Sequence, residues 1–338
     1  MKDGKTIILG IESSCDETSA AVVADGRTVL SDIISSQIEI HKAYGGVVPE
    51  IASRHHLNNI NTVVDQALEQ AETTINEVDA VGVTYGPGLV GALLIGLATA
   101  KAIALCKRIP LVGVHHIHGH ISANYIQYPS LEPPFMALVV SGGHTNIVNV
   151  TDYNQCEVLG ATRDDAVGEA FDKVARVLGL GYPGGPKIDR IAREGDPDAV
   201  PFKRVYLGRD SLEFSFSGIK TGVLNYVHHE QQLGREIHVP DVAASFQQAV
   251  LDVLVDKTMA AVQRYARDTL VVAGGVAANS RLRQMLQQRC DAAGIRLCVP
   301  APVLCTDNAA MIGCAAYYKY IAGDTDDLSL DAVAGLTL

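Results

Sequence analysis

The chain has 338 residues, of which 48% are hydrophobic and 19% charged, and its formal net charge at pH 7 is −11. This length suits two domains, taking roughly 100 to 200 residues for each, and the apolar content argues against disorder outside about the last dozen residues. The acidic balance excludes a protein that binds nucleic acid alone through a uniformly basic surface. Seven cysteines without a CxxC pair argue against a disulfide framework.

Neither a signal peptide nor a membrane span is predicted. Residues 1–6 lead into an apolar stretch that is too short for a signal-peptide core, so we expect a cytoplasmic protein. The longest apolar run, residues 90–106, is interrupted by Lys101 and falls short of the roughly 20 residues that a membrane span needs. We therefore expect a buried helix there and no association with a membrane.

Two stretches share the pattern of strand, polar turn and strand. Residues 7–12 and 20–24 are apolar and flank a polar tip at residues 13–19. Residues 136–150 repeat the pattern around the turn Ser-Gly-Gly-His-Thr at 141–145. We interpret the repeat as a duplication, with a first lobe that begins at residue 7 and a second near residue 135.

The rest of the chain alternates strands and helices. A further buried strand is predicted at residues 270–274, and Asn279, a little further on, suits the N-cap of a helix. Strands that alternate with helical segments indicate an α/β protein. The helical segments are expected at residues 58–72, 90–106, 167–178 and 240–258.

Four histidines lie between residues 115 and 120. On a helix, His116 and His120 stand at i and i+4, on one face and close enough to bind one metal ion. His115 and His118, at i and i+3, are rival partners. The zinc-protease motif HExxH needs Glu at position 117, where this chain has Ile117, so a protease of that type is disfavoured.

Carboxylates gather at the tip of the first hairpin. Glu12, Asp16 and Glu17 form either a solvated acidic turn or a group placed for metal binding or proton transfer. Asp307 precedes the last expected helix, and it is either the cap of that helix or a further metal ligand.

Glycine-rich loops indicate a ligand that is bound through backbone amides. The turn at 141–144 has amides free to point at an anion. Asp172 precedes the loop at 179–186 and Asp189 follows it, so both carboxylates could face ribose hydroxyls. Since the sequence GxxxxGK[ST] is absent, any nucleotide is bound without a P-loop.

Together, these motifs resemble the universal tRNA threonylcarbamoyltransferase family, which includes proteins once called O-sialoglycoprotein endopeptidases. The resemblance runs from about residue 7 to about residue 320, in the order of the family. The motifs are GIESSCDET at 10–18, GVVPE at 46–50, RHH at 54–56, TYGPG at 84–88, HIHGH at 116–120, VSGGHT at 140–145, GGP at 184–186, FSGIKT at 216–221, GGV at 274–276 and TDN at 306–308.

The resemblance implies the actin/Hsp70/hexokinase-like fold, in which two RNase-H-like lobes surround a nucleotide-binding cleft. It implies a first lobe at residues 1–132, with the C-terminal helix 306–325 packed back on it. The second lobe is expected at residues 133–305, and residues 326–338 are expected to form a tail.

The resemblance also implies an activity, namely transfer of the threonylcarbamoyl group from threonylcarbamoyl-AMP to the exocyclic amine of the adenosine 3′ of the anticodon, in tRNAs that read codons beginning with A. It implies that one divalent metal ion, iron or alternatively zinc, binds to His116, His120 and Asp307. Asp16 and Glu17 are expected nearest the chemistry. The residues expected to bind the adenylate are Val139, Val140, Ser141, Gly142, Gly143, Asp172, Gly185, Asp189 and Asn279.

The expected partners, besides tRNA, are an inactive paralogue of the same fold and a small P-loop ATPase. We expect an apolar helical face at residues 51–68 to pair with the paralogue. Basic residues are enriched only locally, at Arg190, Arg193, Lys203, Arg204 and Arg209. The alternatives to this activity are an O-carbamoyltransferase, an ATP-dependent small-molecule kinase of the same fold and a non-catalytic nucleotide-gated scaffold.

Overall fold

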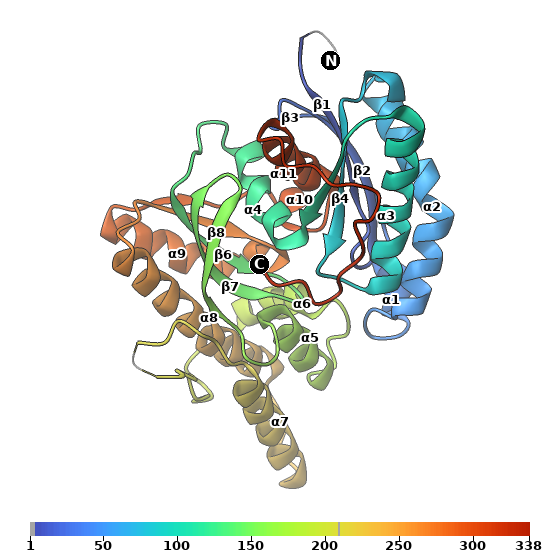
Figure 1. Cartoon of the computed structure of the whole chain (residues 1–338). Helices are drawn as coiled ribbons and strands as arrows, with labels where there is room; N and C mark the ends of the chain where they lie inside the picture. Colours follow the sequence, from blue (N-terminus) through green and yellow to red (C-terminus); the bar gives the residue numbers. More distant parts are fainter. Residues whose placement is uncertain (1–3, 209) are drawn as a thin grey trace. The chain divides into compact units, whose positions relative to one another are not determined.

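The computed structural model describes residues 4–208 and 210–338, and it divides into two compact units. The first unit comprises the chain up to Pro133, the turn Asp152–Gln155 and the whole stretch Pro300–Leu338. The second comprises Pro134–Thr151 and Cys156–Val299. The first unit therefore takes in more of the C-terminal part than the helix that the sequence predicted to return to it (Figure 1).

The sheet of the first unit has the strand order β3-β2-β1-β4-β5. Its first three strands form an antiparallel meander, and the last two run parallel to β1. The predicted first hairpin is confirmed, but its second strand begins at Glu17, so that Glu17, Thr18 and Ser19 already belong to the strand. The strands are β1 (Ile7–Glu12), β2 (Glu17–Ala24), β3 (Thr28–Ser36), β4 (Ala80–Gly86) and β5 (Leu111–His115).

Helices pack against both faces of this sheet. Ile7, Leu9 and Ile11 of β1 share an apolar core with α2 (Pro49–Gln70) and α3 (Val90–Lys107), which lie side by side (Figure 1). The alternate positions of β1 face α11 (Ala309–Ile321) because side chains of a strand point to opposite faces in turn. This unit also contains α4 (His116–Gln127), which packs beside α11, and the short helices α1 (Ile38–Lys42) and α10 (Pro302–Cys305).

Gly10 on β1 lets α11 come close to the sheet. A Cβ atom at this position would lie 2.3 Å from the carbonyl oxygen of Ala309 and 2.7 Å from the amide nitrogen of Gly313. Both of those atoms belong to the backbone, so they could not move aside without shifting the helix. Residue 307, a predicted metal ligand, lies two positions before the first residue of this helix.

The second unit repeats the arrangement, with the strand order β10-β9-β6-β7-β8. β6 pairs antiparallel with β7 and parallel with β9, as β1 does with β2 and β4, which confirms the predicted duplication. The strands are β6 (Phe135–Val140), β7 (Thr145–Asp152), β8 (Gln155–Ala161), β9 (Thr269–Ala273) and β10 (Arg296–Cys298). The helices are α5 (Val167–Val177), α6 (Gly184–Ile191), α7 (Ser217–Gln232), α8 (Val239–Arg264) and α9 (Ser280–Ala293).

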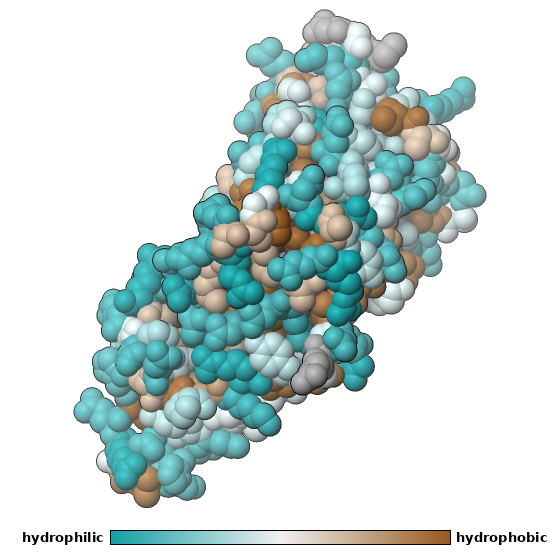
Figure 2. Space-filling model, turned by 90° about the vertical axis from the view of Figure 1, so that its left-hand side faces the viewer, coloured by the Kyte–Doolittle hydropathy of each residue, from teal (hydrophilic) through white to brown (hydrophobic). Residues whose placement is uncertain are grey.

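The expectation that α3 is a buried helix is only partly right. Among the described residues it is the one helix long and apolar enough to cross a membrane, yet a third of it is buried within the protein. Val90, Leu94 and Leu105 are exposed on it, with exposed fractions between 44% and 62%. Apolar side chains also appear as separate patches among polar ones on the face drawn in Figure 2.

The C-terminal residues, where the sequence allowed disorder, are packed onto the first unit. The amide of Asp326 donates to the carbonyl of Leu111 on β5 at 2.8 Å, and that of Val333 donates to the carbonyl of Tyr85 on β4 at 2.8 Å. Leu330 joins the apolar core that β1 shares with α2 and α3. Residues 326–338 are therefore part of the first unit and not a free tail.

Candidate functional site

Three predicted metal ligands lie together in the first unit. One ligand atom from each of His116, His120 and Asp307 lies within 4.8 Å of the others. The Nε2 atom of His116 is 3.5 Å from Asp307 Oδ1, and that of His120 is 3.2 Å from the same oxygen. The two imidazole rings meet edge to face, with centroids 4.6 Å apart. Two nitrogens and one carboxylate oxygen thus converge on one point.

The bonding of His120 fits a metal ligand. Its side chain is fully buried, and neither ring nitrogen forms a hydrogen bond within the described part of the chain. The contact with Asp307 is close in distance but lacks the geometry of a hydrogen bond, as expected of two ligands around a shared ion. A buried imidazole without a partner is costly, and coordination of a cation would satisfy it.

The start of α4 decides which histidines face this point. His115 is the N-cap of α4, and its Nδ1 accepts a hydrogen bond from the amide of Ile117 at 3.2 Å. His118 points elsewhere, because its Nε2 donates to the carbonyl of Tyr153 at 2.7 Å. The predicted i, i+4 pair, His116 and His120, is therefore the one that lies beside Asp307.

Asp307 is not the cap of α11, which was one of its two predicted roles. Asn308 takes the N-cap position, and its side chain accepts a hydrogen bond from the amide of Met311 at 2.9 Å. The amide of Ala309 donates to Ser19 Oγ on β2. Because neighbouring side chains satisfy the start of the helix, the carboxylate of Asp307 is directed to the two histidines.

Glu12 lies on the other side of His116. Its Oε2 atom is 3.1 Å from His116 Nδ1, and the carboxylate also accepts from Thr84 Oγ1 at 2.6 Å and from the amide of Ser14 at 2.5 Å. Burial lowers the pKa of His116, but Asp307 and Glu12 outweigh it and raise that pKa to about 9. Burial likewise opposes ionisation of Glu12, and His116 nevertheless lowers its pKa.

Asp16 and Glu17, the predicted catalytic residues, lie at the start of β2. Asp16 is 7% exposed. Burial, followed by the charges of Asp16 and Asp307, raises the pKa of Glu17 to about 9. Glu17 therefore carries a proton at neutral pH in the metal-free chain. The acidic tip is a buried, electrostatically strained group, so the interpretation as a solvated turn is wrong.

A histidine on α2 fixes the shape of this tip. His56 is buried, its Nδ1 is 2.7 Å from Thr18 Oγ1, and its Nε2 is 2.9 Å from the carbonyl oxygen of Cys15. Thr84 of β4 fixes Glu12 in the same way. Sequence reasoning noticed the motifs that contain these residues but gave them no role, because contacts between distant segments leave no local signal.

In the second unit, the predicted glycine turn follows β6. The amide of Ser141 donates to the carbonyl of His144, and Ser141 Oγ accepts from the amide of His144. Gly142 and Gly143 are exposed, and a Cβ atom on either would meet nothing within 4 Å. Val139 and Val140 are fully buried, so they can offer a ligand only their backbone.

Two other glycines support this turn from behind. Gly274, which follows β9, has φ +89°, and a Cβ atom there would lie 2.5 Å from the carbonyl oxygen of Val140. A Cβ atom at Gly168 in α5 would lie 2.6 Å from the carbonyl oxygen of Ser141. Backbone thus packs directly on backbone, which holds the turn 141–143 at one edge of the sheet.

The other predicted adenylate residues lie in two neighbouring groups. Asp172 on α5 accepts a hydrogen bond from the amide of Gly184 at 2.6 Å, next to Gly185. Asp189 on α6 accepts from the amide and the hydroxyl of Ser280, which follows Asn279. Asn279 is the N-cap of α9, as predicted, and its side chain accepts from the amide of Leu282 at 2.9 Å.

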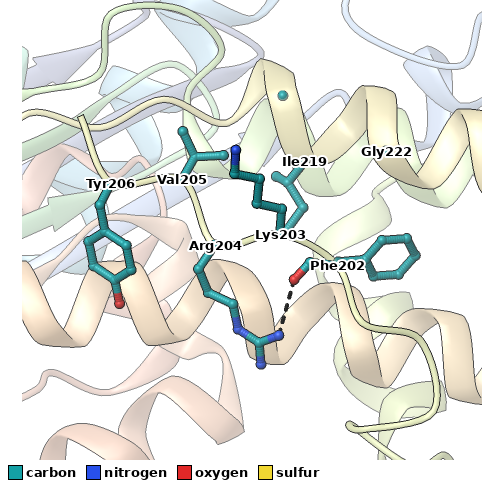
Figure 3. Close-up of a pocket in the computed structure, with 8 residues that line it drawn as sticks. Phe202, Lys203, Arg204, Val205, Tyr206, Ile219 and Gly222 are labelled. Atoms are coloured by element: carbon teal, nitrogen blue, oxygen red, sulfur yellow. Dashed lines mark hydrogen bonds between the residues drawn. The ribbon is translucent and has the colours of Figure 1, made fainter. Parts of the chain in front are cut away.

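A pocket of about 400 Å³ lies between the segment 202–206 and α7 (Figure 3). The side chain of Arg204 is directed away from α7 (Figure 3). It donates to the carbonyl of Phe202 and forms an ion pair with Asp252 at 3.0 Å. Lys203 extends toward Ile219 and has no ion-pair partner among the described residues. Of the other predicted basic residues, Arg193 pairs with Asp189, and Arg209 lies outside the described residues.

The comparisons with known proteins agree with this geometry. The model of the family described as tRNA N6-adenosine threonylcarbamoyltransferase matches residues 28–314. A protein of that name from Clostridium botulinum (strain Kyoto / Type A2) is 60% identical over 331 residues, which are 98% of this chain and 97% of the relative. One from Moorella thermoacetica is 58% identical and covers 99% of this chain and 98% of the relative.

Solved structures show the fold. HypF from T. kodakarensis superimposes with a TM-score of 0.65 at 14% identity, over 95% of this chain and 48% of that chain. Component A of (R)-2-hydroxyglutaryl-CoA dehydratase from Acidaminococcus fermentans superimposes with a TM-score of 0.55 at 14% identity, over 94% of this chain and 99% of that chain. The predicted actin/Hsp70/hexokinase-like fold is confirmed.

Proposed function

The chain belongs to the tRNA N6-adenosine threonylcarbamoyltransferase family, and from this we propose a role for each residue of the candidate site. It transfers a threonylcarbamoyl group to the exocyclic amine of an adenosine in tRNA. The observation that carries this assignment is the 60% identity over almost the whole chain. We propose threonylcarbamoyl-AMP as the donor and the adenosine 3′ of the anticodon, in tRNAs that read codons beginning with A, as the acceptor.

The donor must be activated because the exocyclic amine of adenine is a poor nucleophile, its lone pair being delocalised into the ring. In the transfer, N6 of the adenosine attacks the carbamoyl carbon, the bond from that carbon to the phosphate oxygen breaks, and AMP leaves. The nitrogen then loses one proton. The target base must also leave its stack, which costs a few kcal/mol, though less in an anticodon loop than in a duplex.

Asp16 is the proposed acceptor of that proton. It lies at the tip of the β1–β2 hairpin, and its charge, with that of Asp307, helps to keep Glu17 protonated. Glu17 is protonated and can donate a hydrogen bond, so we assign the role of the base to Asp16. Both are held by neighbouring residues, since Ser36 Oγ donates to Glu17 and the carbonyl of Asp16 accepts from the amide of Gln37.

His116, His120 and Asp307 would hold one divalent metal ion, which we propose to be iron, with zinc as the alternative. When bound, such an ion supplies Lewis acidity to a carbonyl or phosphate oxygen. The support from this chain is the pair of unbonded ring nitrogens of buried His120 and the direction of Asp307 toward both imidazoles.

The turn 141–143 would bind the phosphate of the donor through its backbone amides. The exposed amides of Gly142 and Gly143 carry no side chain that would keep a phosphate away. Fixed amide dipoles stabilise the charge that develops on the leaving AMP. The buried Val139 and Val140 lead into this turn. The adenosine part of the donor would contact Asp172, Gly185, Asp189 and Asn279.

The chain would work in the cytoplasm with partners. Its charge of −11, and the pairing of Arg193 and Arg204 with carboxylates, leave little basic surface for tRNA. An inactive paralogue of the same fold would complete that surface, docking on α2 and α3, where Leu57 and Leu94 are exposed. A small P-loop ATPase is the third expected component.

The experiment that tests the activity is mass spectrometry of nucleosides. tRNA is incubated with the protein, threonine, bicarbonate and ATP in a cell extract depleted of the protein, and threonylcarbamoyladenosine is measured. We expect the modified nucleoside only when the protein is added back. Phosphorylation of a small molecule with unmodified tRNA would instead indicate a kinase of the same fold, and carbamoylation of a hydroxyl would indicate an O-carbamoyltransferase.

A further inference from the structure

We infer that Glu12 is a positioning residue that fixes the tautomer and the orientation of the His116 ring and thereby sets the metal affinity of the site. This inference rests on the proposed metal site. Glu12 is the last residue of β1, and its side chain is fully buried. It can act on a metal ion only through His116.

The two ring nitrogens of His116 face different partners. Nδ1 is 3.1 Å from Glu12 Oε2 and 3.2 Å from Ser14 Oγ, whereas Nε2 is directed to Asp307. Glu12 Oε2 already accepts a hydrogen bond from Thr84 Oγ1, so it faces Nδ1 as an acceptor, and the contact places the hydrogen on Nδ1. Nε2, which lies beside His120 and Asp307, is then the nitrogen that would bind a metal ion.

Glu12 is itself fixed by two distant segments. Thr84 Oγ1 on β4 donates to Oε2, and the amide of Ser14 donates to Oε1, so both carboxylate oxygens are occupied. A buried carboxyl group needs such partners to satisfy its two oxygen atoms. With them, it is a rigid hydrogen-bond acceptor that leaves the imidazole one orientation.

The test compares the metal affinity of the full-length chain and its Glu12→Gln variant. The probe is Zn²⁺ alone, titrated against a chromophoric chelator at neutral pH, with no tRNA or nucleotide present. We expect Glu12→Gln to weaken Zn²⁺ binding by about 10- to 100-fold, the usual effect of removing a partner behind a metal-bound histidine. Thr84→Val, which leaves the carboxylate in place but removes one of its bonds, should weaken binding by less.

A matched control separates loss of the contact with His116 from a general disturbance of the hairpin by a side-chain amide. Glu17 is a carboxyl group on the same hairpin, but its hydrogen bond is with Ser36 and not with His116. Glu17→Gln should therefore leave the Zn²⁺ affinity within about 3-fold of the parent, well below the change expected for a partner of the ligand. Equal losses in Glu12→Gln and Glu17→Gln would overturn the inference, because a disturbance of the hairpin without contact to His116 would then explain both.

A second readout reports on the ring itself. Nitrogen-15 NMR of ring-labelled histidine distinguishes a hydrogen on Nδ1 from one on Nε2, and His116→Gln identifies the signal. We expect one tautomer, with the hydrogen on Nδ1, in the Zn²⁺-loaded parent, and a mixture or a broadened signal in Glu12→Gln. If Glu12→Gln does not fold, the same measurements on Thr84→Val decide. Unchanged affinity and an unchanged tautomer in the folded variant would contradict the inference.

Discussion

The two units have the same strand order but differ at the tip of the hairpin that opens each sheet. In the first unit the tip between β1 and β2 holds buried carboxylates, and in the second the turn between β6 and β7 holds exposed glycines. One tip accumulates negative charge, which favours a cation. The other offers bare amides, which favour an anion. The same scaffold thus supplies two opposite chemistries through a few residues at equivalent places.

The helices that support the two tips differ in the same sense. In the first unit, buried polar side chains hold the tip, since His56 on α2 bonds to Thr18 and Cys15. In the second unit, backbone packs on backbone at Gly168 and Gly274. Substitutions should therefore affect the two units differently. Those in the first should change chemistry and metal binding, and those behind the second turn should change stability.

The largest effect is expected at the proposed metal ligands. His120→Ala should lower the metal content of the purified protein to background and reduce transfer activity by about 100-fold or more, because a tridentate site loses one of its three ligands. Metal is measured by mass spectrometry of the element, and folding by circular dichroism. His118→Ala, which removes a histidine on the same helix that bonds to Tyr153, is the control and should retain its metal. Full metal content in His120→Ala would contradict the proposed site.

Asp16→Ala should separate the chemistry of the first unit from the binding by the second. We expect adenylate affinity to stay within about 3-fold of the parent while the transfer rate falls by about 100-fold, the usual contribution of a general base. Calorimetric titration with a non-hydrolysable donor analogue gives the affinity, and single-turnover kinetics give the rate. Equal losses in both would show that Asp16 binds the donor and is not the base.

Substitutions at exposed and at supporting glycines of the second turn should have different effects. Gly274→Ala places a Cβ atom 2.5 Å from the Val140 carbonyl at φ +89°, so we expect a loss of on the order of 2 kcal/mol in the free energy of unfolding. Gly142→Ala meets nothing within 4 Å and should cost well under about 1 kcal/mol. Its adenylate affinity should nevertheless fall if the turn binds phosphate. Chemical denaturation and donor titration measure the two effects.

The charge at the first tip should appear in the pH dependence of stability. The pKa of Glu17 rises from 4.5 in the unfolded chain to about 9 in the folded one, so between these values the folded state retains a proton that the unfolded state has released. Stability contributed by this group is therefore present below pH 4.5 and is lost as pH rises toward 9. In the metal-free protein, Glu17→Gln should match the parent near pH 4.5 and exceed it in melting temperature increasingly toward pH 9. A constant difference would contradict the raised pKa.

The sequence predicts features that depend on neighbouring residues better than features that depend on contacts between distant segments. The alternation of strands and helices, the repeated hairpin and the N-cap at Asn279 are local, and the structure has all of them. The i, i+4 spacing placed His116 and His120 on one face, and the resemblance to the family favoured them over His115 and His118. The structure adds the reason, because His115 accepts from the amide of Ile117 and His118 donates to the carbonyl of Tyr153.

The remaining features depend on long-range packing. Glu12 bonds to Thr84 and His116, which are far away in the sequence, and no spacing rule joins them. The exposure of Val90 on α3 could not be predicted either, since an apolar helix with exposed side chains has the same composition as a buried one. The residues after position 325 were predicted to be a tail. Their hydrogen bonds to β4 and β5 join backbone atoms, so no side-chain pattern indicates them.

The smallest effect is expected for tRNA binding, because the positive charges of this chain are few and scattered. Lys203 lines the pocket beside α7 without an ion-pair partner among the described residues, whereas Arg204 pairs with Asp252. Each phosphate neutralised by a cation adds about 0.7 to 0.9 to the slope of the logarithm of affinity against the logarithm of salt concentration. Lys203→Gln should therefore lower this slope by about that amount and weaken binding only a few-fold, if the lysine contacts a phosphate. Arg204→Gln should leave the slope unchanged and instead reduce thermal stability.

Fluorescence anisotropy of labelled tRNA, titrated with each variant at a series of salt concentrations, measures these slopes. The isolated chain should bind weakly, because its charge of −11 repels a polyanion, and addition of the paralogue should raise both the affinity and the slope. With the paralogue present, the change caused by Lys203→Gln should persist, since the contact belongs to this chain. Equal affinity and equal slopes with and without the paralogue would show that this chain carries a complete tRNA-binding surface of its own. The chain would then need a basic surface region in addition to the two hairpin tips.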